Sequence, residues 1–168
     1  MAVHSAFANE STVVRERSPD AASTSTSTGR EAGVFEHILV AVDPEMDERV
    51  SDVALSLAAD HGAEVDALSV VPMNASVDHW DMVVERREES AEAALDALGA
   101  AADELDVSVA KQLRYGTPAE EIQRYAEYHD VDLVVLGEPT RTGLRRFFSP
   151  KSVTELVRRS TSVPVLTV

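Results

Sequence analysis

One stretch decides the fold class of this 168-residue chain: ILVAVD, residues 38–43. A short apolar run of this kind is typical of a strand that is buried on both faces, as in a parallel sheet covered by helices. A second run, LVVL at residues 133–136, ends at Gly137 in the same way. In open parallel sheets, ligands bind beyond the carboxyl ends of the strands, where the strand order reverses. Asp43 and Gly137 are therefore the first candidates for a functional cleft.

Strand and helix patterns alternate from residue 36 to the last residue of the sequence. Further strands are predicted at 65–71, 107–113, 131–136 and 163–168, and helices at 46–60, 80–104, 118–129 and 152–159. This alternation predicts an α/β domain with a five-stranded, mainly parallel sheet and helices on both faces. The two strongest apolar runs belong at the centre of the sheet and the polar third strand at an edge, so the expected order is 3-2-1-4-5.

Three predicted helices carry start signals. Thr117 is followed by Pro118 and then by Glu120, which is a favourable order for a helix start. Ser152 has Glu155 three residues later, which predicts a capping box. Asp43 is predicted to cap a helix that begins at Pro44.

The amino-terminal part of the sequence differs from the rest. Residues 1–34 are poor in large apolar side chains and contain the repeat STSTST at 23–28. Such a segment buries too little surface to offset its ordering entropy. We expect a disordered extension over 1–34 and one folded domain over 35–168.

The composition narrows the classes of partner. The chain has 30 acidic and 15 basic residues, a net charge of −15, and only two lysines, Lys111 and Lys151. This charge disfavours nucleic acid and anionic lipid, and together with the shortage of lysine it indicates a halophilic protein. No cysteine is present, and neither a secretory leader nor a long apolar span is evident. We expect a cytoplasmic protein.

Catalytic motifs are missing from the sequence. It contains no nucleophile-elbow serine, no zinc signature and no paired acid and base motif. The five histidines lack metal-binding spacing and are expected at the surface or at helix ends: His4, His37, His61, His79 and His129. The sequence therefore does not predict an enzyme.

Several segments, in order, resemble the universal stress proteins: ILVAVD at 38–43, GTP at 116–118, LVVLG at 133–137, SVTELV at 152–157 and VPVL at 163–166. The resemblance covers residues 36–168. It implies a Rossmann-like domain, usually a homodimer, in which some members bind ATP between the first and fourth strands. Carried over position by position, the site residues would be Ala41, Val42, Asp43, Val70, Leu136, Gly137, Thr140, Arg141, Gly143, Lys151, Ser152 and Val153. In the family, the aspartate lies next to adenine and ribose, and the residue at Val70 contacts the base.

The phosphate loop implied by the resemblance is altered in this chain. Gly137 matches its first glycine, but Thr140 and Lys151 stand where the family has the second and third. These replacements restrict the backbone and add side chains where phosphates would lie. Arginines that could hold a phosphate crowd the same loop: Arg141, Arg145 and Arg146. The sequence leaves the binding of ATP or of another nucleotide open, and a divalent cation is expected only together with a nucleotide.

The last predicted strand lies at an edge of the sheet, and no later segment of the sequence can cover it. Its apolar residues predict a homodimer paired through this edge: Val163, Val165, Leu166 and Val168. The leading hypothesis is a regulatory, stress-response protein that acts as a dimeric interaction module. The alternatives are a slow nucleotide hydrolase on the same fold and a scaffold that binds no nucleotide.

Overall fold

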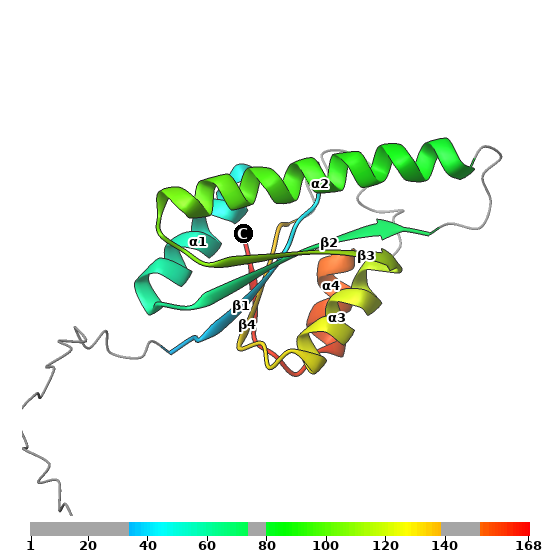
Figure 1. Cartoon of the computed structure of the whole chain (residues 1–168). Helices are drawn as coiled ribbons and strands as arrows, with labels where there is room; N and C mark the ends of the chain where they lie inside the picture. Colours follow the sequence, from blue (N-terminus) through cyan, green and yellow to red (C-terminus); the bar gives the residue numbers. More distant parts are fainter. Residues whose placement is uncertain (1–33, 74–79, 139–151) are drawn as a thin grey trace, which may run out of the picture.

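The computed structural model describes residues 34–73, 80–138 and 152–168. Strands and helices alternate along the chain (Figure 1). The strands are β1 (His37–Ala41), β2 (Glu64–Pro72), β3 (Val109–Gly116), β4 (Leu133–Leu136) and β5 (Val165–Thr167). The helices are α1 (Glu48–His61), α2 (Trp80–Glu104), α3 (Pro118–Tyr128) and α4 (Val153–Ser160).

The five strands form one parallel sheet in the order β3-β2-β1-β4-β5, which confirms the predicted order. The two apolar runs lie at its centre. Leu39 and Val40 of β1 pair with Val134 and Val135 of β4, and all four side chains are completely buried. Burial on both faces explains why these strands are continuous apolar runs.

Helices cover both faces of the sheet, with α1 and α2 on one face and α3 and α4 on the other (Figure 1). Successive side chains of a strand point to opposite faces. Ile38 and Val40 therefore pack into the cluster under α1 and α2, whereas Leu39 packs into the cluster under α3 and α4. Among the described residues, no helix combines the length and the apolar character needed to cross a membrane.

Helix α1 begins later than predicted. Asp47 is its cap and accepts a hydrogen bond from Arg49 N at 2.9 Å, so the helix begins at Glu48 rather than near residue 46. The prediction that Asp43 caps a helix starting at Pro44 is therefore wrong, because a turn separates Asp43 from the helix. The helical spacing of apolar residues predicts a buried stripe on α1 that comprises Val50, Val53, Ala54, Leu57 and Ala58. In the structure Val50, Ala54 and Ala58 are buried together with Leu55, whereas Val53 and Leu57 are half-buried.

The other two start signals have different outcomes. Ser152 caps α4 by accepting a hydrogen bond from Glu155 N at 3.2 Å, which confirms the serine half of the predicted capping box, while the Glu155 carboxylate pairs with Arg159 at 2.6 Å. Pro118 is the first residue of α3, but the Thr117 side chain makes no capping hydrogen bond.

The edge strands differ most from their predicted limits. β3 is displaced toward the carboxyl end of its predicted range, because its register with β2 continues until Gly116 lies opposite Pro72. β5 is shorter than predicted, but the residues just before and just after it are also hydrogen-bonded to β4. Val134 N donates to Pro164 O at 2.9 Å, and Val168 N donates to Leu136 O at 3.0 Å.

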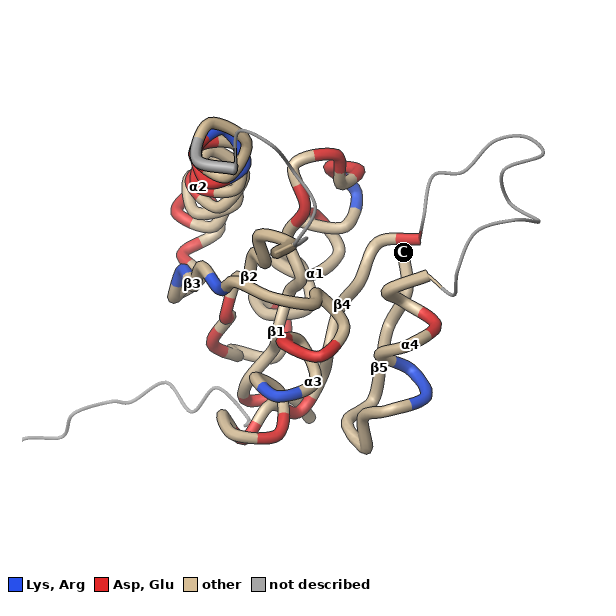
Figure 2. The backbone as a smooth tube through the Cα atoms, turned by 90° about the vertical axis from the view of Figure 1, so that its right-hand side faces the viewer, with Lys and Arg blue, Asp and Glu red and all other residues tan. Residues whose placement is uncertain are grey.

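Acidic positions are spread over α1, α2 and α3, and basic positions are few (Figure 2). The ion pairs that Lys and Arg form with carboxylates in the described part of the chain lie at the surface: Lys111–Asp96, Arg124–Glu121 and Arg159–Glu155. Such exposed pairs contribute at most about 1 kcal/mol each. The negative charge is therefore mostly uncompensated within the described structure.

Candidate functional site

A pocket of about 360 Å³ lies at the carboxyl ends of β1, β2 and β4. It is closed on one side by Pro118 and Ile122 of α3 and on another by the amino end of α4. This is the point at which the strand order reverses, since the chain runs from β1 to β2 on one side and later returns to β4 on the other. The volume lies in the range of small-molecule sites.

The pocket brings together eight of the twelve residues predicted for the site: Ala41, Val42, Asp43, Val70, Leu136, Gly137, Ser152 and Val153. The other four, Thr140, Arg141, Gly143 and Lys151, lie outside the described residues. The structure thus places these eight residues around one pocket, and their role in binding stays a prediction.

Asp43 lies at the mouth of the pocket in a tight turn after β1. Its Oδ1 accepts a hydrogen bond from Glu45 N at 2.8 Å, and its carbonyl accepts one from Met46 N at 2.9 Å. Pro44 favours such a turn because its ring fixes φ. The turn holds the exposed Asp43 carboxylate in one orientation beside the pocket.

The end of β1 is fixed from the side of β2. Val42 N donates to Leu68 O at 2.8 Å, and the buried Ser69 hydroxyl donates to Val42 O at 2.8 Å. Both polar groups of the Val42 backbone are therefore paired with β2. The floor of the pocket at this strand end is consequently rigid.

Gly137 has a packing role that the sequence did not reveal. A Cβ atom placed on it would lie 3.3 Å from Val50 Cγ2 and 3.7 Å from Met46 Cγ. The close approach of α1 to the end of β4 thus favours glycine, whether or not a phosphate binds there. Thr154 of α4 donates from its hydroxyl to Gly137 O at 3.0 Å and ties the amino end of α4 to the same strand end.

The electrostatics of the pocket are acidic in the part that the structure describes. Three carboxylates line it, those of Asp43, Glu45 and Glu138, and the lining residues of the described ranges include no Lys or Arg. The first turn of α4 supplies the positive end of a helix dipole and backbone N–H groups that have no carbonyl partner within the helix itself. Within the described ranges, no three His, Asp or Glu side chains are grouped so that they could hold a metal ion.

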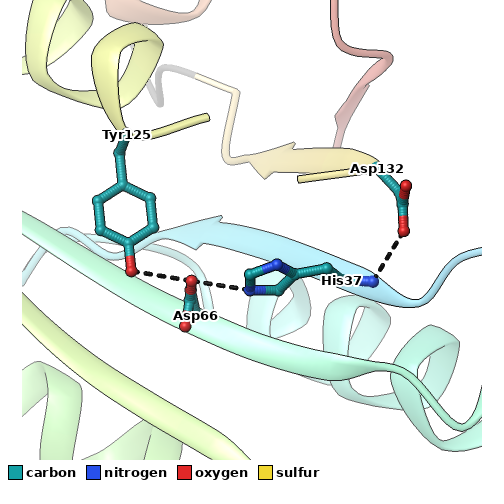
Figure 3. A network of polar contacts seen from close by, with 4 residues as sticks. All are labelled: His37, Asp66, Tyr125 and Asp132. Atoms are coloured by element: carbon teal, nitrogen blue, oxygen red, sulfur yellow. Dashed lines mark hydrogen bonds and ion pairs between the residues drawn. The ribbon is translucent and has the colours of Figure 1, made fainter. Parts of the chain in front are cut away.

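A second polar group lies under α3 and was missed in the sequence (Figure 3). Asp66 of β2 is 7 % exposed, and its Oδ2 accepts hydrogen bonds from the Tyr125 hydroxyl and from His37 Nε2, both at 2.8 Å. Burial and the hydrogen bond to Asp66 raise the pKa of Tyr125 to about 12. Asp132 accepts two backbone hydrogen bonds at the start of β1, from Glu36 N at 2.8 Å and from His37 N at 2.9 Å.

The expectation that every histidine lies at the surface or at a helix end is wrong for His37, which is a half-buried strand residue paired with Asp66. His61 and His129 do lie at the ends of α1 and α3. A signal for the pairing was present: an aspartate inside the apolar strand 64–72 must find partners when it is buried.

Comparison with known proteins agrees with this architecture. The family model described as "Universal stress protein family" matches residues 35–168. A universal stress protein of Methanocaldococcus jannaschii is 33% identical over 120 residues, which is 68% of this chain and 70% of the relative.

Solved structures show the same fold. The universal stress protein UspA from Lactobacillus plantarum is 26% identical, has a TM-score of 0.65, and is matched over 80% of this chain and 97% of its own. A universal stress protein from Archaeoglobus fulgidus in complex with dAMP is 22% identical, with a TM-score of 0.57 over 80% of this chain and 98% of its own. With the family model spanning the whole described sheet, the chain belongs to the universal stress protein family.

Proposed function

We propose that this protein is a regulatory module of the universal stress type that binds an adenine mononucleotide in the pocket between β1 and β4. One observation carries the proposal: a pocket of suitable size lies at the switch point of the sheet and combines an apolar wall, a fixed carboxylate and a helix amino end. The protein would act through occupancy of this site and through its dimer surface rather than by turnover.

The base and the sugar would occupy the part of the pocket near β1 and β2. Apolar side chains supply flat walls for a base: Leu68, Val70, Pro118, Ile122 and Leu136. The Asp43 carboxylate at the mouth would accept hydrogen bonds from the ribose hydroxyls. Because one of its oxygens already holds the turn through Glu45 N, little orientational freedom remains to be lost on binding.

The phosphate would lie at the first turn of α4. The backbone N–H groups and the dipole at a helix amino end favour an anion there. The carboxylates of Asp43, Glu45 and Glu138 oppose each additional negative charge. We therefore expect a monophosphate to bind more tightly than metal-free ATP, and a divalent cation to reduce the difference.

The structure of the Archaeoglobus fulgidus relative with dAMP supports the proposal, since it is an instance of this fold holding an adenine mononucleotide. At 22% identity it supports the fold's capacity rather than the affinity of this chain.

The test is calorimetric titration of nucleotide-free protein with AMP, metal-free ATP and ATP with Mg²⁺. Asp43→Asn keeps an oxygen for Glu45 N but loses the charge, so the affinity for AMP should fall about tenfold, as for a hydrogen bond to a charged group. Asp52→Asn is the matched control, because Asp52 is an exposed carboxylate on α1 outside the lining of the pocket.

Two results would overturn the proposal in different directions. If none of the three ligands binds, the scaffold that works without nucleotide is favoured. If ATP releases phosphate in proportion to protein and Asp43→Asn abolishes the release, the protein is instead a slow hydrolase.

A further inference from the structure

The pocket wall contains a sulfur atom. The chain has four methionines and no cysteine, so sulfur chemistry in this protein depends on thioethers alone. Met46 is half-buried and lines the pocket. Met73 and Met82 are 50% and 67% exposed and lie outside its lining. The same molecule therefore provides a pocket methionine and two internal controls.

Met46 holds the turn that carries Asp43. Of residues 43–47, Met46 alone is half-buried while the others are exposed, and its side chain packs against the core cluster under α1 and α2. Its Cγ lies close to the position that a Cβ on Gly137 would take, at 3.7 Å, so the side chain reaches the end of β4. Its backbone N–H donates to Asp43 O. Met46 is thus the apolar anchor of the turn.

We propose that Met46 is an oxidation site through which peroxide weakens ligand binding, an inference that rests on the proposed function of this pocket. In the reaction, hydrogen peroxide transfers one oxygen atom to the thioether Sδ. The O–O bond is broken, sulfur is oxidised by two electrons to the sulfoxide, and water leaves. The chemistry requires no metal and no thiol.

The sulfoxide would harm this site for two reasons. It converts an apolar side chain into a polar one, and its oxygen is a strong acceptor in a wall where Asp43, Glu45 and Glu138 are already acceptors. The apolar packing of Met46 against the core cluster under α1 and α2 is also lost, so the turn is released from the core. The Asp43 carboxylate then loses its fixed orientation.

The experiment is a peroxide titration followed by peptide mass mapping and calorimetry with AMP. The more exposed Met73 and Met82 should convert first and Met46 more slowly, and saturating AMP should protect Met46 alone. The affinity for AMP should fall about fivefold or more in step with Met46 sulfoxide, the cost of an unpaired acceptor in the wall.

Two variants separate the sites. Met73→Leu combined with Met82→Leu should retain the peroxide-dependent loss of AMP affinity. Met46→Leu should show the same affinity before and after peroxide, whatever its starting value. Loss of affinity in peroxide-treated Met46→Leu, or a Met46 that stays reduced when Met73 and Met82 are fully converted, would overturn the proposal.

A measurement without ligand keeps this inference distinct from the proposed function. The Met46 N–H donates to Asp43 O, so we expect this amide to exchange slowly and oxidation to speed its exchange. If AMP does not bind at all, the proposed function fails while this measurement still decides whether Met46 holds the turn. Unchanged exchange at Met46 after its complete oxidation would refute the anchoring role.

Discussion

Asp66 is the single carboxylate that the described structure buries, and its surroundings show what that burial requires. A buried charge is tolerated only when it is paired and hydrogen-bonded. Its Oδ2 has both a tyrosine hydroxyl and a histidine ring nitrogen as donors. The donors come from α3 and β1, so this one carboxylate fastens a helix and the neighbouring strand to β2.

Removing the hydroxyl from Tyr125 tests this fastening. Tyr125→Phe leaves Asp66 with one donor fewer, and we expect the free energy of unfolding to fall by about 1–2 kcal/mol. Tyr128→Phe on the same helix is the control: Tyr128 is 77% exposed, and we expect a change within about 0.5 kcal/mol. Denaturant unfolding at neutral pH measures both, and equal effects of the two substitutions would contradict the network.

The unmodified protein and Tyr125→Phe should also differ in how their free energy of unfolding depends on pH. The folded state raises the pKa of Tyr125 from 10.0 to about 12, so it favours the neutral phenol. This contribution to stability is present below pH 10 and is lost as the pH rises from 10 to about 12. Over that interval the unfolding free energy of the unmodified protein should fall more steeply than that of Tyr125→Phe.

The order of the secondary-structure elements was predictable because it depends on local patterns. Strands β1 and β4 were recognisable as apolar runs. Most of the buried face of α1 was recognisable from the helical spacing of its apolar residues. The cap of α1 was not, since Asp43 and Asp47 are both acceptable caps and only the intervening turn decides between them. Local propensity identifies candidates for a cap, and tertiary geometry selects one.

The position of the pocket was predictable from the sequence, whereas the physical reasons for some of its residues were not. Gly137 was predicted as a phosphate-loop glycine, whereas the structure shows that contact with Val50 of α1 already favours glycine there. The Asp66 network was missed because its partners lie 29 and 59 residues away in the sequence. No local pattern can pair residues at such separations.

In the proposed complex the phosphate lies at the amino end of α4. The cap of this helix can be tested without ligand, because it contributes to the stability of the free protein. Ser152→Ala removes the acceptor of Glu155 N, and the free energy of unfolding should fall by about 1 kcal/mol. Ser160→Ala, at the other end of the helix, should have a smaller effect, because its exposed hydroxyl bonds a carbonyl of the preceding turn. Thermal unfolding of both variants makes the comparison, and equal effects would argue against the cap.

The charge of the whole molecule sets the conditions under which two copies could meet. A net charge of −15 produces repulsion between subunits that salt screens within about 10 Å at 0.1 M and within about 3 Å at 1 M. Apolar association is in turn strengthened by salts that are excluded from protein surfaces. Both effects act in the same direction, so molar salt should favour assembly.

β5 is the edge at which assembly is expected. Its inner side is bonded to β4, and no other strand of the described structure covers its outer side. Its side chains and those beside it are partly exposed: Val163, Val165, Leu166 and Val168. Two such edges related by a two-fold axis can pair and satisfy their free backbone groups. We therefore propose a homodimer through β5.

Light scattering tests this proposal at low and at molar salt. The unmodified protein should have the mass of a dimer, and less of it should dissociate at molar salt than at low salt. Val165→Lys should lower the mass toward that of the monomer. Ala110→Lys is the matched control, because it places the same charge on the opposite edge strand, β3, where Ala110 is already exposed. Circular dichroism should show that both variants remain folded, so that a lower mass reports the interface rather than the fold. A monomeric mass for the unmodified protein in molar salt would exclude the dimer, and a shift caused equally by Ala110→Lys would remove β5 from the interface.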